Sequence, residues 1–205
     1  EQFGGGDYRV VSLKDLAALD DIEEEDLPAI EATLSLDEVL YRLLREEGEL
    51  PSHEMAVFSD LARADAEEVR RVWPQIDLLR RRIVAAVVAD QSANLPGMDY
   101  GAFLRILLDD ADARVRSFAI EGLSEEGAAP DLLGRYIQSL QGEEDVEVRA
   151  AAAAALGAYI LEGELEELDS ALAMRAEQAL MAVLTNRAEP LLVQCRALES
   201  IAYSG

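Results

Sequence analysis

One pattern is written twice between residues 103 and 157, and it restricts the fold more than any other feature of the chain. If Val115 and Val148 are taken as position i, each is followed by Arg at i+1, Ala at i+4, a small residue at i+7 and Leu at i+8. These offsets place the apolar residues on one face of an α-helix. An acidic turn precedes each Val, and an apolar helix precedes each turn. The repeated unit is helix, acidic turn, helix, and the 33 residues between equivalent positions are typical of a stacked helical array.

This pattern resembles the HEAT repeat family. The resemblance is carried by the acidic turn, the Val-Arg pair, the Ala at i+4 and the small-Leu pair, with Gly157 after the second copy. It implies an all-α fold, a right-handed superhelix of antiparallel helix pairs in which the second helices line the concave side. In that family the turn acid and the arginine form a ladder between repeats, which implies the pairs Asp110 with Arg116 and Glu143 with Arg149.

Two further copies, which match the pattern at fewer positions, lie on either side of the two clear copies. Val69 aligns as position i of an earlier copy, although its i+4 residue is Trp73, and Pro74 predicts a break before a further helix from Asp77 to about Gln91. Val193 aligns as position i of a last copy, in which Gln194 replaces the arginine. We therefore expect a helical repeat domain over residues 33–205.

The remaining N-terminal residues have a different composition. Residues 20–26 hold six acids in seven positions, and no Lys or Arg occurs from Asp15 to Tyr41. Blocks of like charge are typical of solvated linkers and interaction tails. We expect residues 1–32 to form an acidic, weakly structured segment. At the other end no polar capping helix follows Leu198, Ile201 and Tyr203, which predicts that this end continues into further repeats or meets another molecule.

The net charge of −24, from 42 acids and 18 bases, restricts the partners. A nucleic-acid binder needs a basic surface, and so acidic a protein repels phosphate backbones and anionic membranes. Basic partners remain open, and so does the simpler explanation that the charge keeps an alanine- and leucine-rich array soluble. No apolar run of membrane-spanning length and no signal-peptide pattern is present, so the sequence predicts a cytoplasmic protein.

Residues that could carry catalysis are few. One histidine, His53, and one cysteine, Cys195, lie far apart in the sequence and favour neither a metal site nor an activated nucleophile. The carboxylates are too numerous for any pair to be informative. The run from Asp109 to Asp112 lacks the glycine and distal glutamate of a calcium loop, and a helix-capping turn is the favoured interpretation. We expect no enzyme activity and no cofactor.

One basic cluster runs against the overall charge. It consists of five arginines around one tryptophan: Arg70, Arg71, Trp73, Arg80, Arg81 and Arg82. One interpretation pairs the arginines with neighbouring acids such as Glu67, Glu68 and Asp77. The other makes the cluster a docking patch for an acidic segment, such as residues 20–26 of this chain. A nucleic-acid site ranks third because the surrounding field opposes it.

The predicted function is non-catalytic binding of a protein or peptide, since HEAT repeats mostly serve as protein-binding scaffolds. Positions opposite the buried face of the second helices give Ser117, Glu121 and Glu199 as groove residues, with Ile120 and Tyr159 at the groove's edge. Small and acidic side chains favour a basic or mixed-charge segment as the ligand.

The alternative function comes from the same resemblance: some HEAT-like proteins are chromophore lyases that act on bilin-carrying proteins. That activity requires a pocket where Trp73, Tyr100, Tyr136 and Tyr159 converge. The sequence names neither the partner nor the oligomeric state.

Overall fold

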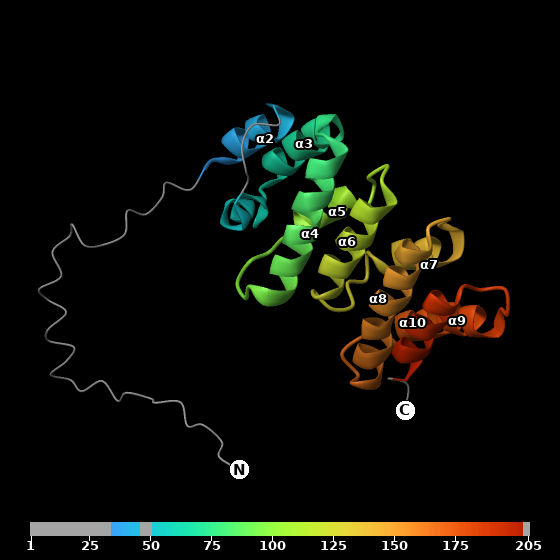
Figure 1. The fold of residues 1–205 in the computed structure, drawn as a ribbon. Coiled ribbons are helices and arrows are strands. Elements are labelled where there is room, and N and C mark those ends of the chain that lie inside the picture. Colours follow the sequence, from blue (N-terminus) through green and yellow to red (C-terminus); the bar gives the residue numbers. More distant parts are fainter. Residues whose placement is uncertain (1–33, 46–50, 203–205) are drawn as a thin grey trace, which may run out of the picture. The chain divides into compact units, whose positions relative to one another are not determined.

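The computed structural model describes residues 34–45 and 51–202, within a compact unit spanning Leu34–Gly205. Helices joined by turns and loops make up these residues, with no strand among them, so the all-α prediction is confirmed (Figure 1). The helices, in chain order, are α2 (Leu36–Arg45), η3 (Ser52–Phe58), α3 (Arg63–Val72), η4 (Trp73–Gln75), α4 (Leu78–Asn94), α5 (Gly101–Leu107), α6 (Ala113–Ser124), α7 (Leu133–Gly142), α8 (Val146–Glu164), α9 (Ser170–Thr185) and α10 (Leu191–Ile201). The predicted acidic segment, residues 1–32, lies outside the described residues.

The helices from α5 onward pack as pairs. The second helices contact one another in turn, α4 with α6, α6 with α8 and α8 with α10 (Figure 1). The first helices α5, α7 and α9 each pack on the second helix that follows them, and α7 also contacts α9. The second helices therefore form a row, and each of them from α6 onward contacts a neighbour in this row and the first helix of its own pair. No helix of the described residues is long and apolar enough to cross a membrane.

The acidic turns begin the second helices, as the sequence predicts. The Asp112 carboxylate accepts a hydrogen bond from Val115 N at 3.3 Å, and Asp145 accepts bonds from Glu147 N and Val148 N at 2.9 and 3.1 Å. Such N-caps satisfy backbone donors that have no partner in the first turn of a helix. The Asp112 run is thus a capping turn.

The predicted helical face is the buried one. Val115, Ala119 and Leu123 on α6 are buried, and so are their counterparts on α8. The small residue at i+7 has a steric reason, because a Cβ built on Gly122 would lie 3.2 Å from the Ala89 Cα of α4. A larger side chain at this position would press against the α4 backbone and against Leu104, whose Cδ1 would lie 2.9 Å from the added Cβ.

The predicted first copy at Val69 is wrong. Val69 lies in α3, which contacts the first helix α5. The helix that contacts the second helix α6 is α4, whose N-cap is Asp77. In α6 and α8 the N-cap precedes position i by three residues, so position i of α4 is Arg80 and position i+1 is Arg81. The break predicted at Pro74 is confirmed, since α3 ends at Val72 and the short η4 follows.

Candidate functional site

The four second helices share an exposed stripe. Positions i−1 and i+6 are seven residues apart, so they lie on the same side of a helix. The i−1 residue is exposed on every second helix, and the i+6 residue is exposed on all but α4, where it is partly exposed. We call these eight residues the second-helix face: Leu79, Ala86, Arg114, Glu121, Glu147, Ala154, Leu192 and Glu199. Because the helices contact one another in sequence, the stripes form one surface along the row.

The chemistry of this face changes along the row. On α4 it is apolar, with Leu79 65% exposed and Ile83 half exposed beside it. On α6 and α8 it carries Arg114, Glu121, Glu147 and the small Ala154, and on α10 it carries Leu192 and Glu199. The Ser117 hydroxyl donates a hydrogen bond of 3.1 Å to Glu121 Oε1 and thereby holds that carboxylate on the face. The face therefore offers apolar contact at the α4 end, and beyond α4 its three acids outnumber the single cation Arg114.

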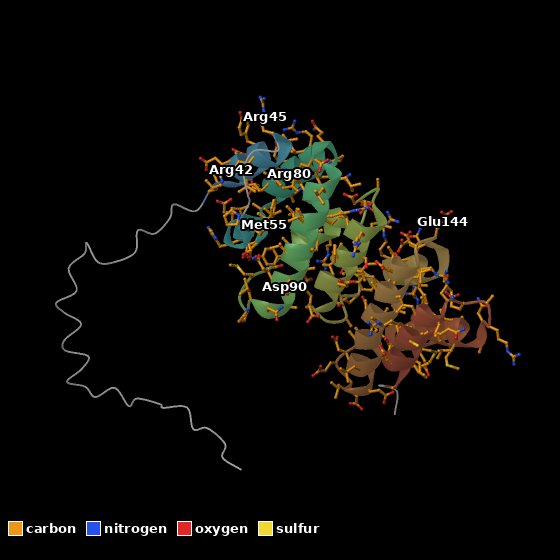
Figure 2. The ribbon with its side chains drawn as sticks, viewed as in Figure 1. Arg42, Arg45, Met55, Arg80, Asp90 and Glu144 are labelled. Carbon is orange, nitrogen blue, oxygen red and sulfur yellow. The ribbon has the colours of Figure 1, made fainter. Side chains whose placement is uncertain are left out.

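A hollow of about 600 Å³ lies between the N-termini of α6 and α8 and adjoins the face. Arg114 and Glu147 belong to both, and the other lining residues are Arg82, Asp112, Ala113, Glu144, Asp145 and Val146. Glu144 is exposed at the turn between α7 and α8 (Figure 2). Sequence reasoning missed this hollow, although the charged residues at position i−1 could have indicated it.

Three of the predicted groove residues are not on the surface. Ser117, Ile120 and Tyr159 are all buried, so the prediction that they face a partner is wrong, whereas Glu121 and Glu199 are exposed. Position i+5, occupied by Ile120 on α6, is also buried on α4 and α8, where it is Ala85 and Ala153. Tyr159 donates a hydrogen bond from its hydroxyl to Ala129 O at 2.5 Å.

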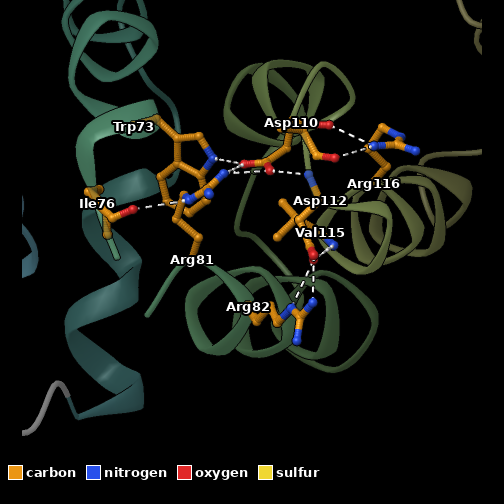
Figure 3. A network of polar contacts seen from close by, with 9 residues as sticks. Trp73, Ile76, Arg81, Arg82, Asp110, Asp112, Val115 and Arg116 are labelled. Atoms are coloured by element: carbon orange, nitrogen blue, oxygen red, sulfur yellow. Dashed lines mark hydrogen bonds and ion pairs between the residues drawn. The ribbon is translucent and has the colours of Figure 1, made fainter. Parts of the chain in front are cut away.

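Beneath the turns, buried polar groups join neighbouring repeats (Figure 3). The Asp110 side chain is 0% exposed and accepts hydrogen bonds from Trp73 Nε1 at 2.6 Å and from Asp112 N at 2.7 Å. Arg81 binds the same carboxylate at 2.5 Å and donates from Nε to Ile76 O at 3.1 Å. Arg81 therefore joins the carbonyl of its own turn to the acid of the next turn.

Two further arginines make the same two contacts, and we call each such arginine, with the carbonyl and the acid that it binds, a clamp. Arg116 binds the carbonyl of Asp110 at 2.8 Å and the carboxylate of Glu143 at 2.7 and 2.9 Å. Arg149 donates to Leu140 O at 3.2 Å and forms an ion pair with Glu189. The predicted carboxylate pairs, Asp110 with Arg116 and Glu143 with Arg149, are therefore wrong. Each acid pairs instead with the arginine of the preceding second helix, because the turn of the next repeat lies over that arginine.

The clamp pattern ends on α10. Gln194 occupies the arginine position and donates from Nε2 to Asn186 O at 2.9 Å, so it keeps only the contact with its own turn. A neutral amide thus stands where the three preceding second helices have a cation.

Ion pairs near the turns also change the pKa values of the groups that form them. Hydrogen bonds from Arg82 lower the pKa of the Asp112 carboxyl below its ordinary value, and the hydrogen bonds that Arg116 donates to Glu143 raise the pKa of the Arg116 guanidinium. Burial raises the pKa of the Tyr136 and Tyr159 phenols.

The arginine cluster is largely occupied by internal contacts. Arg71 pairs with Glu68, as the first interpretation has it, while Arg81 and Arg82 pair with the distant Asp110 and Asp112. Arg70 is exposed and Arg80 partly buried. Trp73 is buried, so it is not the surface residue of a docking patch. The acidic segment proposed to dock there lies outside the described residues.

The aromatic residues of the lyase alternative fill the core. Trp73 packs edge-on against Phe103, with ring centroids 5.3 Å apart, and Tyr136 packs edge-on against Tyr159 at 6.3 Å. The Tyr100 hydroxyl donates to Gln91 Oε1 at 2.7 Å. All four are buried, and no observation on the described residues favours the lyase alternative.

No group of three His, Cys, Asp or Glu side chains among residues 34–45 and 51–202 could hold a metal ion. His53 on η3 and Cys195 on α10 are both exposed and lie on different helices. Comparison with protein-family models, with curated proteins and with solved structures gives no match for this chain. Function is therefore inferred from the chemistry of the surface.

Proposed function

We propose that this chain is a HEAT-like, right-handed α-solenoid that acts as a non-catalytic scaffold and binds a protein or peptide segment on its second-helix face. The observation that carries the proposal is the shared exposure of positions i−1 and i+6 along the row of second helices. The stacking of the second helices and the three arginine clamps between repeats support the solenoid. Rigid helices present such a face with little ordering cost on binding.

The ligand that fits is an amphipathic segment with basic residues. Leu79 and Ile83 offer apolar contact at the α4 end, and Glu121, Glu147 and Glu199 attract lysine or arginine along the rest of the face. The small Ala154 leaves room for a helix backbone or a larger side chain of the guest. Because the whole chain carries a charge of −24, a basic ligand also gains long-range attraction, which salt screens.

A pair of synthetic peptides tests the proposal. One carries leucine on one helical face and lysine on the other, and its twin carries glutamate in place of lysine; each has about 18 residues, roughly 27 Å as a helix. Fluorescence anisotropy with the full chain measures both affinities over a range of salt concentrations. We expect only the lysine peptide to bind, and its affinity to fall as salt rises.

Charge reversal locates the site. Glu121→Lys with Glu199→Lys should weaken the lysine peptide about tenfold or more at low salt, since two close charge pairs are lost. Glu164→Lys with Glu167→Lys changes the net charge equally at exposed acids outside the face and should cost less than about twofold. Equal losses in the two double variants would mean that only the overall charge attracts the peptide, and the proposal would fail.

A further inference from the structure

The contact between α6 and α8 differs from the second-helix contacts on either side of it. Between α4 and α6, the Ser92 hydroxyl donates a hydrogen bond to Gly122 O at 3.0 Å, and Gly122 lies against the α4 backbone. Between α8 and α10, the Ser200 hydroxyl donates to Ala153 O at 2.9 Å, and a Cβ built on Gly157 would lie 3.3 Å from the Ser200 Cα. In the described part of the chain, α6 and α8 share neither a hydrogen bond nor a glycine at which their backbones meet.

The first helices differ at the same boundary. Helix α3 contacts α5 and α7 contacts α9, but α5 and α7 make no comparable contact. Two arginines bridge this boundary instead. Arg105 of α5 binds Asp131, which lies just before α7, at 3.2 Å, and Arg135 of α7 binds Asp109, which lies just before α6, at 2.7 Å. The side chains of Asp131 and Asp109 are 63% and 73% exposed, so these ion pairs contribute little stability and are screened by salt.

The loop between α6 and α7 is attached to the C-terminal side of this boundary. The Tyr159 hydroxyl of α8 donates to Ala129 O at 2.5 Å, and the Glu162 carboxylate of α8 accepts a hydrogen bond from Ala128 N at 2.7 Å. The chain therefore crosses the boundary near Gly127, whose φ of +84° lies in the region that favours glycine.

The turn side of the boundary is only partly filled. The clamp between Arg116 and Glu143 crosses it, with hydrogen bonds of 2.7 and 2.9 Å, and the hollow of about 600 Å³ lies beside this clamp between the N-termini of α6 and α8. Close-packed interfaces resist displacement. Rotation therefore meets less resistance between α6 and α8 than between α4 and α6 or between α8 and α10.

We propose that the boundary between α6 and α8 is a hinge about which α7 to α10 rotate relative to the helices up to α6, and that salt loosens this hinge. The arginine bridges restrict the rotation, and screening of the pairs with Asp109 and Asp131 widens its range. Because the second-helix face crosses the boundary, the hinge changes the spacing between Glu121 on α6 and Glu147 on α8. The rotation is a property of the chain alone, so it requires no ligand on that face.

Distances between pairs of nitroxide labels, measured by pulsed electron paramagnetic resonance on the full chain, test the hinge without any ligand. The labels are attached to introduced cysteines in a Cys195→Ser background. The crossing pair, Ala64→Cys with Gln138→Cys, joins α3 to α7. Two control pairs each keep one of these labels and stay on one side of the boundary: Ala64→Cys with Glu121→Cys on α6, and Gln138→Cys with Gln178→Cys on α9. All four label positions are exposed.

The crossing pair should have the widest distribution of distances. A rotation of roughly 15° moves a label that lies about 20 Å from the axis by about 5 Å, so we expect the crossing distribution to be wider than both controls by about that amount. Raising the salt concentration from roughly 0.1 to 1 M shortens the Debye length from about 10 to 3 Å. This change should widen the crossing distribution further and leave both control distributions unchanged.

Arginine variants test the bridges. Arg105→Ala with Arg135→Ala should give at low salt the width that the unsubstituted chain reaches at high salt. Arg71→Ala with Arg196→Ala removes the same charge from ion pairs within single helices and should leave the width unchanged. Equal widening in the two double variants would overturn the proposal. So would a crossing distribution of the unsubstituted chain that is as narrow as the controls at both salt concentrations, a result that needs no bridge variant to fold.

Discussion

Replacing Asp110 with alanine removes the carboxylate that joins the first two second helices. Its side chain is fully buried and binds Trp73, Arg81 and the backbone of Asp112. The substitution leaves the Arg81 guanidinium, which is 13% exposed, without its counter-charge, and it leaves the indole N–H without a partner. Breaking a buried ion pair by removing one member costs about 3–5 kcal/mol, so we expect Asp110→Ala to destabilise the chain by about that amount.

The neighbouring acid provides the control. Asp109 pairs with Arg135, but its side chain is 73% exposed, so Asp109→Ala should cost less than about 1 kcal/mol. Urea unfolding followed by circular dichroism measures both values. Asp110→Ala combined with Arg81→Met should recover part of the loss, because the uncompensated charge is then gone.

Two results would refute this reasoning. Equal costs for Asp110→Ala and Asp109→Ala would show that burial of the clamp does not determine its contribution. A double variant as unstable as the sum of Asp110→Ala and Arg81→Met would show that the two residues do not interact.

Further predictions concern the core and the clamps. Val148→Asp should destabilise the chain by more than about 3 kcal/mol in urea unfolding, because it places an unpaired charge at a fully buried position. Arg149→Ala should cost about 2–3 kcal/mol, since it leaves the largely buried Glu189 carboxylate without its cation; a cost below about 1 kcal/mol would contradict the clamp. Gly122→Leu should lower the melting temperature, whereas Gly142→Leu, where an added Cβ meets nothing within 4 Å, should lower it less. The lowered pKa of Asp112 stabilises the fold above the ordinary carboxyl pKa of 3.8 and is lost as the pH falls through the folded value, so Asp112→Asn should flatten the acid unfolding curve below about pH 4.

Local patterns were sufficient to predict the good repeats. Val115 and Val148 lie where the apolar spacing places them, and the acids of the preceding turns cap their helices. The first copy was misassigned because Val69-Arg70 resembles the motif, while the true position i is Arg80. The signal that could have found it is Asp77, an N-cap three residues before Arg80, as in the other repeats.

Contacts between repeats could not be read from either copy alone. Arg116 pairs with Glu143, which lies 27 residues later in the sequence, because the turn of the next repeat lies over the arginine. The number of residues between clamp partners varies because the helix pairs differ in length. Burial of Tyr159 likewise depends on its packing against Tyr136 of α7 rather than on its position within one helix. Sequence reasoning placed Glu121 and Glu199 on the side opposite the buried face, and both are exposed.

The central claim is that the second-helix face binds a basic amphipathic segment, and amide NMR of the full chain with the lysine peptide tests it most directly. The account predicts that perturbed signals concentrate at Leu79, Arg114, Glu121, Ala154 and Glu199, on four successive second helices. Perturbations gathered on the first helices α5 and α7, or around Arg70 and Arg71, would contradict it.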